Sequence, residues 1–201
     1  LPKEGKGGGA FCANLPMIGE SRVLSNFDGS FSSVGTLAHE LGHAWHGHCL
    51  KDLPIVKTHY PMPLAETASI FNEGVVTDAV LNKLSDDEKL AIIEAELMDA
   101  TQVIVDIYSR YLFESKVIEV RHDHGMSVNE MKEAMLDAQK KAYGDGLDND
   151  ALHPYMWACK THYYSPELAF YNWPYAFGLL FAKLTFAEYK KAPAGFMDKY
   201  K

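Results

Sequence analysis

The chain has 201 residues, enough for one large domain or two small ones. Hydrophobic residues make up 47% and charged residues 23%, which is ordinary for a globular protein and too apolar for a disordered one. The formal charge is −8, from 19 Lys and Arg against 27 Asp and Glu. The sequence therefore predicts no nucleic-acid partner, since such a partner requires a basic surface.

Membrane insertion and a disulfide scaffold are both excluded by simple counts. The best candidate for a spanning helix, residues 176–187, is short and carries Lys183, whereas a spanning helix needs about 20 apolar residues. Three cysteines, Cys12, Cys49 and Cys159, cannot all pair, which favours a reducing compartment, the cytoplasm. The chain opens without Met and closes on a helix-like pattern, so we expect a piece of a longer protein.

Short strands are predicted at residues 9–14 and 22–27, separated by turn residues. From residue 32, apolar side chains recur at three- and four-residue steps, as they do on one face of a helix. Three prolines then end this helix, Pro54, Pro61 and Pro63, before a second helix predicted over 64–84. The expected fold is mainly α, with a small β-hairpin near the N-terminus.

A capping box of Ser85 and Glu88 predicts a third helix that runs past residue 118. Its expected buried stripe consists of Leu90, Ile93, Leu97, Ile104, Ile107, Tyr111 and Leu112. A second capping box, Ser127 with Glu130, begins a fourth helix that ends at Gly144. A short helix near residues 155–160 and a long one over 174–190 complete the predicted elements.

The first predicted helix carries the pattern His-Glu-x-x-His, as His39, Glu40 and His43. Residues four apart lie on one helix face, so the two imidazoles can bind a single zinc ion. Glu40 would lie beside the open coordination position and act as general base toward a water whose pKa falls to about 7. The alternative is a solvent-exposed helix face that carries these residues by chance.

The third ligand is left open by the spacing. Cys49 could bind zinc as a thiolate if the helix broke after His43. Glu66 and Glu73 lie seven apart, on one face of the next predicted helix, and Glu66 follows after a loop long enough for an antiparallel return. A carboxylate that does not bind the metal could instead orient a ligand histidine or be purely structural.

Two other segments have residues suited to binding a peptide. A short polar and aromatic stretch contains His162, Tyr163, Tyr164, Tyr171 and Tyr175. Tyrosine hydroxyls there could donate to the oxygen that becomes negative when water attacks a carbonyl, or could be ordinary packing. Near the N-terminus, Gly7, Gly8 and Gly9 could let a substrate approach as an added strand, or could be a flexible end.

Several blocks of sequence together resemble the oligoendopeptidase F / thimet oligopeptidase family of zinc metallopeptidases. The blocks are residues 6–12 (KGGGAFC), 39–46 (HELGHAWH), 66–73 (ETASIFNE), 162–164 (HYY) and 170–178 (FYNWPYAFG). They extend over nearly the whole chain. The resemblance implies a zincin-like helical catalytic domain, residues 1–201, that is the C-terminal portion of an enzyme nearly three times this size.

The family also implies roles for particular residues. It implies one zinc ion held by His39, His43 and Glu66, with Glu40 as catalytic base and Glu73 as a candidate partner of a ligand histidine. By motif, His162 and Tyr175 match the residues that contact substrate and stabilise the oxyanion. Tyr171 matches a neighbouring tyrosine, although Trp173 replaces a family tyrosine in this segment.

The expected activity is zinc-dependent endopeptidase cleavage of short oligopeptides in the cytoplasm. Two alternatives remain: a catalytically impaired zinc-binding piece of such an enzyme, and a zinc exopeptidase. Two histidines and a glutamate would also accept Co²⁺ or Mn²⁺.

Overall fold

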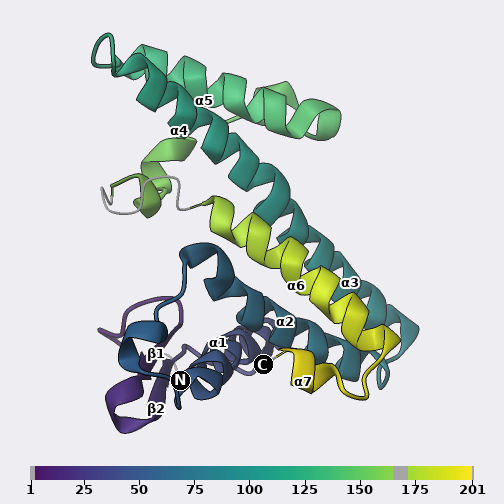
Figure 1. The fold of residues 1–201 in the computed structure, drawn as a ribbon. Coiled ribbons are helices and arrows are strands. Elements are labelled where there is room, and N and C mark those ends of the chain that lie inside the picture. Colours follow the sequence, from purple (N-terminus) through teal and green to yellow (C-terminus); the bar gives the residue numbers. More distant parts are fainter. Residues whose placement is uncertain (1–2, 165–171, 201) are drawn as a thin grey trace. The chain divides into compact units, whose positions relative to one another are not determined.

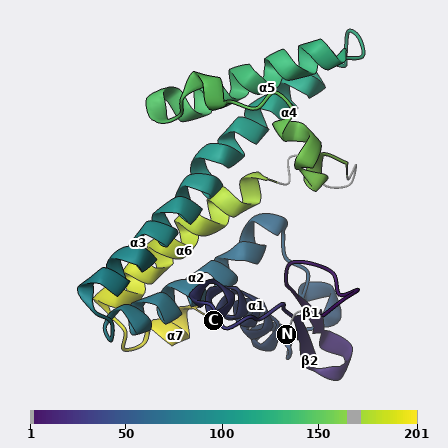
Figure 2. The same ribbon diagram turned by 180° about the vertical axis from the view of Figure 1, so that it is seen from behind.

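The computed structural model describes residues 3–164 and 172–200. The chain forms two compact units. The first comprises Leu1–Ile92 and Phe177–Lys201, and the second comprises Ile93–Ala176. The described residues are mainly helical and contain one two-stranded antiparallel sheet, which confirms the predicted fold class (Figures 1 and 2).

The first unit begins with a β-hairpin. Strand β1 (Phe11–Leu15) pairs with β2 (Glu20–Leu24) in a register that sets Phe11 opposite Leu24. Between the strands lies a 3₁₀ turn, Pro16–Ile18, which ends at Gly19 with φ of 66°. Only glycine adopts this left-handed conformation without strain, so Gly19 allows the chain to reverse within four residues.

Two long helices follow the hairpin. Helix α1 (Phe31–Leu50) is capped by Ser30, whose hydroxyl accepts a hydrogen bond from the Ser33 backbone N–H at 3.1 Å. A loop with the 3₁₀ turn Ile55–Lys57 leads to α2 (Met62–Leu81), which has proline in its first turn. At their closest approach, a Cβ on Gly42 would lie 2.5 Å from the Ser69 Cα, so only glycine lets the helices come this close.

Two further helices complete the first unit. Helix α6 (Trp173–Lys191) enters it at Phe177, and α7 (Phe196–Tyr200) follows a short turn. Phe71 from α2, Ala182 from α6 and Phe196 from α7 form the buried core of this unit. Stacked and edge-to-face aromatic contacts around Phe71 add to this packing.

The predicted third helix is present, but a π turn divides it. Helix α3 (Asp86–Thr101) passes through the π turn Gln102–Asp106 into α4 (Ile107–Val120). The predicted buried stripe is wrong over most of its length, because Leu90 and Leu97 are 66% and 63% exposed and Ile93, Ile104 and Tyr111 are exposed as well. The buried positions include Ile92, Asp106, Ile107, Arg110 and Phe113. The π turn interrupts the regular helical spacing at residues 102–106, so positions after it do not continue the face that α3 sets before it.

The second unit packs α4 against α5 (Val128–Tyr143). The predicted capping box at its start is confirmed, with reciprocal hydrogen bonds between Ser127 and Glu130. Phe113, Met135 and Ala138 form the core of this unit. Among the described residues after α5 are four short 3₁₀ turns, Gly144–Gly146, Asn149–Ala151, Met156–Cys159 and Thr161–Tyr164.

Within residues 3–164 and 172–200, no helix combines the length and apolar composition that crossing a bilayer requires.

Candidate metal centre

Three side chains of the first unit converge where α1 crosses α2. His39 and His43 come from α1, and Glu66 comes from α2. The Glu66 Oε2 atom lies 3.2 Å from the His39 Nε2 and 3.6 Å from the His43 Nε2. One donor atom from each residue lies within 4.8 Å of the other two. Both ligand-bearing helices are 20 residues long, and the glycine at position 42 allows them to approach closely enough for the three side chains to meet.

This donor set fits a divalent transition metal. Two imidazole nitrogens and one carboxylate oxygen are the three protein ligands found in many catalytic zinc sites, which leave a fourth position open. The Glu66 side chain is 9% exposed, so its charge is largely removed from water. A buried carboxylate that faces two imidazoles is stabilised by a cation among them. The three residues could therefore hold a metal ion.

Glu73 contacts His39 at Nδ1, the ring nitrogen that does not face Glu66. Its Oε1 atom lies 2.5 Å from the His39 Nδ1. A hydrogen bond at Nδ1 fixes the ring orientation and leaves Nε2 directed at Glu66. Metal-binding histidines commonly have such a carboxylate partner.

Other contacts hold the backbone of the site in place. Asn72 donates to the Ala38 carbonyl at 2.6 Å, which ties α2 to α1. Asn14 on β1 donates to the His43 carbonyl at 3.2 Å. Ser69 donates to the Glu66 Oε2 at 3.1 Å and so orients the carboxylate. The sequence analysis missed these three residues, and short polar side chains at such positions give no pattern that would have identified them.

The third helix of the first unit also approaches the site. A Cβ on Gly178 of α6 would lie 2.7 Å from the Glu66 Cβ, so α6 packs directly on the residue that carries the carboxylate. A glycine within a predicted helix was the available signal, because it often marks a close approach.

Burial and the neighbouring charges raise the pKa of His39 and lower those of His43 and Glu66. Burial lowers the pKa of His39, but hydrogen bonds to Glu66 and Glu73 outweigh burial and raise this pKa to about 10. Burial lowers the pKa of His43. For Glu66, burial raises the pKa, but the contacts with His39 outweigh it and hold the pKa below its usual value. The metal-free cluster therefore holds a proton on His39 that a bound cation would replace.

Glu40 lies on α1 beside His39 and is 5% exposed. Burial raises the pKa of its carboxyl group above the usual value. A carboxylate with a raised pKa binds a proton more readily, which suits a group that accepts and then releases one.

The remaining predicted site residues are located as follows. Gly8 and Gly9 precede β1 and are exposed, and Asn26 donates to the Gly9 carbonyl at 3.1 Å. His162 belongs to the 3₁₀ turn Thr161–Tyr164, and Tyr175 is half-buried in the first turn of α6. Both belong to the second unit, whereas the metal cluster belongs to the first. Tyr171 lies outside the described residues.

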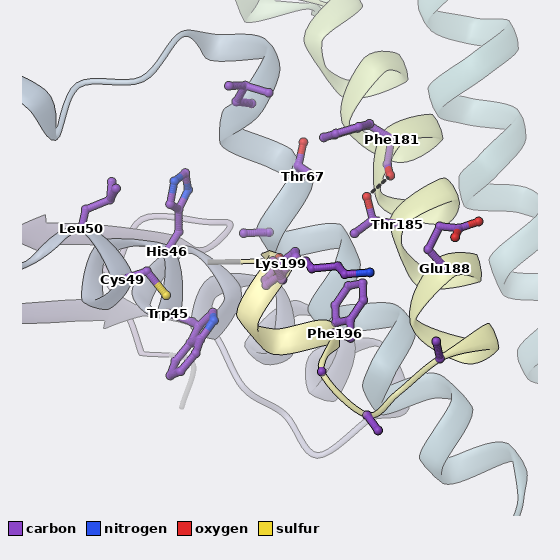
Figure 3. Close-up of a pocket in the computed structure, with 16 residues that line it drawn as sticks. Trp45, His46, Cys49, Leu50, Thr67, Phe181, Thr185, Glu188, Phe196 and Lys199 are labelled. Atoms are coloured by element: carbon purple, nitrogen blue, oxygen red, sulfur yellow. Dashed lines mark hydrogen bonds between the residues drawn. The ribbon is translucent and has the colours of Figure 1, made fainter.

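A separate cavity of about 550 Å³ lies in the first unit (Figure 3). Residues of α1, among them Trp45, His46 and Cys49, and residues of α2, among them Thr67, line part of it, and α6, α7 and the turn between them supply the rest. His39, His43 and Glu66 do not line it. Cys49 lines this cavity, whereas the described group of donor atoms within 4.8 Å of one another consists of His39, His43 and Glu66.

Comparison with known proteins identifies the family. The family model named Peptidase family M3 matches residues 1–199. An oligoendopeptidase F homologue of Borreliella burgdorferi is 29% identical over 98% of this chain and 33% of its own length. A chromosomal oligoendopeptidase F of Lactococcus lactis subsp. cremoris is 27% identical over 88% of this chain and 29% of its own length.

A solved structure agrees with these relatives. A Chlamydophila abortus protein assigned as a peptidase matches 96% of this chain and 32% of its own, with a TM-score of 0.79 and 25% identity. The chain thus spans about a third of the length of the proteins it matches. These matches confirm the resemblance to oligoendopeptidase F. The chain belongs to peptidase family M3.

Proposed function

We propose that this chain is the C-terminal catalytic portion, residues 1–201, of a zinc-dependent endopeptidase that hydrolyses short oligopeptides. The single observation that carries the proposal is the convergence of His39, His43 and Glu66 within 4.8 Å. The names of relatives, oligoendopeptidase F among them, support peptides as the substrate class. The three cysteines are free, which fits a reducing compartment, the cytoplasm.

His39, His43 and Glu66 would hold one zinc ion. When bound, zinc supplies Lewis acidity, which makes a neighbouring water more acidic and polarises a peptide carbonyl. Glu73 keeps the His39 ring oriented through its contact at Nδ1. Ser69 does the same for the Glu66 carboxylate.

Glu40 would move the proton that hydrolysis requires. Its carboxylate takes a proton from the water that attacks the scissile carbonyl. It then delivers this proton to the amine nitrogen as the C–N bond breaks, so the base is regenerated for the next cycle. Burial raises the pKa of Glu40 above its usual value, which favours uptake of the proton in the first half of this transfer.

The substrate contacts belong to the same proposal. His162 and Tyr175 would donate hydrogen bonds to the carbonyl oxygen that becomes negative during attack. Tyr171 and the backbone of Gly8 and Gly9 would bind the peptide chain itself.

The decisive test is Glu40→Gln in the full-length protein. We expect a loss of kcat of about 10²- to 10⁴-fold, because a positioned general base contributes that much. Zinc content, measured by atomic absorption, should stay at one ion per chain. Glu94→Gln makes the same chemical change at an exposed carboxylate and should leave both quantities unchanged. Unchanged turnover in the Glu40 variant would refute the assigned base.

Cleavage products separate endopeptidase from exopeptidase action. Peptides blocked at both ends should be cut internally. If only peptides with a free end are trimmed, the exopeptidase alternative is correct.

One observation favours the alternative that the isolated chain is a catalytically impaired zinc-binding piece of such an enzyme. Because it spans about a third of its relatives, much of the surface that positions a peptide could lie elsewhere. We expect the 201-residue chain alone to bind zinc and to hydrolyse peptides at least about 100-fold more slowly than the full-length protein, since misplacement of substrate costs this much. Equal kcat/KM for the two would dismiss the impaired-fragment reading.

A further inference from the structure

A second buried cluster of charge lies in the second unit, at the junction of the π turn and α4. Asp106 ends the π turn and is 7% exposed, and Arg110, one helical turn later, is 6% exposed. The Arg110 guanidinium donates to the Asp106 carboxylate, and Tyr143 of α5 donates to the same carboxylate at 3.2 Å. Because π turns occur often at functional sites, this pair is a candidate for a functional role.

The guanidinium also fixes the start of α6. Its Nη1 donates to the Asn172 Oδ1 at 3.2 Å. Asn172 is 2% exposed and directly precedes α6, and its carbonyl accepts a hydrogen bond from the Tyr175 backbone N–H at 3.3 Å. The position of Tyr175 in the first helical turn therefore depends on where Arg110 holds Asn172.

The backbone of the same arginine fixes a second element. The Tyr163 hydroxyl donates to the Arg110 carbonyl at 3.3 Å. Burial raises the pKa of Tyr163, so its hydroxyl keeps the proton that it donates. The Tyr163 ring packs edge-on against Phe113, 5.5 Å between centroids, in the core of this unit. The 3₁₀ turn Thr161–Tyr164, which includes His162, is thereby attached to α4.

Stability alone is a poor reason for this arrangement. Among the described residues, the Arg110 Nε and the Asn172 Nδ2 are buried without a hydrogen-bond partner. A buried donor left without an acceptor destabilises the folded state. Apolar residues of similar volume would often stabilise a fold as well as a buried ion pair does. We therefore look for the role of Arg110 in the positions that it gives to Tyr163 and Asn172.

We propose that Arg110 is a positioning residue for substrate binding, because it fixes both flanks of residues 165–171. Tyr163 attaches the turn with His162 to the Arg110 carbonyl, and Asn172 attaches the helix with Tyr175 to the Arg110 guanidinium. Arg110 thus sets the backbone positions of both residues relative to each other. This inference rests on the proposed function, in which His162 and Tyr175 contact the substrate.

The test compares four variants of the full-length, zinc-loaded protein. Tyr163→Phe removes the bond to the Arg110 carbonyl, and Asn172→Leu removes the acceptor of the guanidinium. Asn172→Asp adds a buried charge but keeps an acceptor for the guanidinium, so it should retain the attachment that Asn172→Leu loses. Tyr143→Phe is the matched control, because it removes a hydroxyl from the same buried pair and carries neither flank.

Two readouts are measured on each variant. Amide hydrogen exchange of residues 161–164 and 172–176 should become at least about tenfold faster in Tyr163→Phe and Asn172→Leu, and in neither of the other two. The kcat for an oligopeptide should fall about 10- to 100-fold in the same two variants, with KM changed less and zinc content unchanged.

Each outcome decides a different statement. Unchanged exchange in Tyr163→Phe and Asn172→Leu overturns the attachment, whatever the activity. Faster exchange with a kcat equal to that of Tyr143→Phe overturns the positioning role. In a third outcome, the variants exchange faster than the wild type, as expected, while the zinc-loaded wild type hydrolyses no peptide. This result refutes the proposed function and leaves the attachment of the two flanks established.

Discussion

The two units each bury a polar cluster built on an i, i+4 pair, and the two clusters differ in charge balance. In the first unit, His39 and His43 on α1 face a carboxylate from α2. In the second, Asp106 and Arg110 on the same helical stretch neutralise each other. The first cluster is complete only with a cation or a proton added, whereas the second contains its own cation.

The comparison shows that spacing alone does not give a buried pair its role. Residues four apart share a helix face in both cases. What differs is the presence of a fixed positive charge that satisfies the carboxylate. A buried carboxylate that faces imidazole nitrogens is a candidate metal ligand. A buried carboxylate that is already paired with an arginine has its charge neutralised, and the remaining N–H groups of the guanidinium can hydrogen-bond to neighbouring segments.

The largest expected effect comes from unbalancing the second cluster. Asp106→Ala leaves the Arg110 guanidinium buried without its partner, which should lower the free energy of unfolding by about 3–5 kcal/mol. Urea unfolding measures this loss. The double variant Asp106→Leu with Arg110→Met should recover most of the stability, because no buried charge remains. A loss below about 1 kcal/mol for Asp106→Ala, the range of an exposed ion pair, would show that the pair is not effectively buried.

Removal of the carboxylate from the first cluster should act on metal binding instead. Glu66→Ala is expected to lower zinc affinity by more than about 100-fold, which exceeds the effect of losing a ligand's outer partner. Competition with a chromophoric chelator measures the affinity. Glu94→Ala, at an exposed carboxylate, is the matched control. If both variants bind zinc as the wild type does, the comparison between the clusters fails.

Glu73→Gln should have a smaller effect of the same kind. The variant loses the charge at the His39 Nδ1 but keeps the ring and all three candidate ligands. Zinc affinity should fall by about 10- to 100-fold, as is usual when such a partner is lost. Calorimetric titration with zinc tests this. A loss as large as that of Glu66→Ala would indicate that Glu73 itself binds the metal.

The pH dependence of zinc binding should reveal the proton that the cation replaces. In the metal-free chain, burial lowers the pKa of His39, but Glu66 and Glu73 raise it to about 10. Zinc affinity should therefore rise with pH, by up to about tenfold per unit between pH 6.5 and 9. Chelator competition over this range gives the slope, and a flat profile would contradict the assignment.

The same proton has the opposite effect on the stability of the metal-free chain. The pKa of His39 is raised above its unfolded value near 6.5, so the proton is bound more tightly in the folded state. Its contribution to the free energy of unfolding is complete below pH 6.5 and is lost as the pH rises through about 10. Urea unfolding of metal-free protein should show this decline.

The sequence predicted what depends on local geometry. A helix with His39 and His43 four residues apart brings the two rings to one face, whatever the rest of the fold does. The choice among Cys49, Glu66 and Glu73 could not be made from spacing, because it depends on how two helices cross. In the structure, α1 and α2 approach closely at Gly42 and Ser69, and the Glu66 carboxylate lies 3.2 Å from His39 and 3.6 Å from His43.

The second cluster escaped prediction for a related reason. Opposite charges four apart, as in Asp106 and Arg110, usually form an exposed pair on a helix surface. Here they are buried at the end of a π turn, and no periodic pattern in the sequence announces such a turn. The predicted stripe through Leu90 and Leu97, which precede that turn, was wrong because both side chains are exposed. Helix start signals such as Ser127 and Glu130 were reliable because they are purely local.

The crossing at Gly42 has a consequence for protein engineering. Copying the histidines and the glutamate onto another pair of helices would leave the ligand atoms too far apart unless the new backbones also approached to van der Waals distance. A transplanted centre would therefore have to carry over the glycine and the small residue opposite, Ser69, before its metal-binding side chains could function.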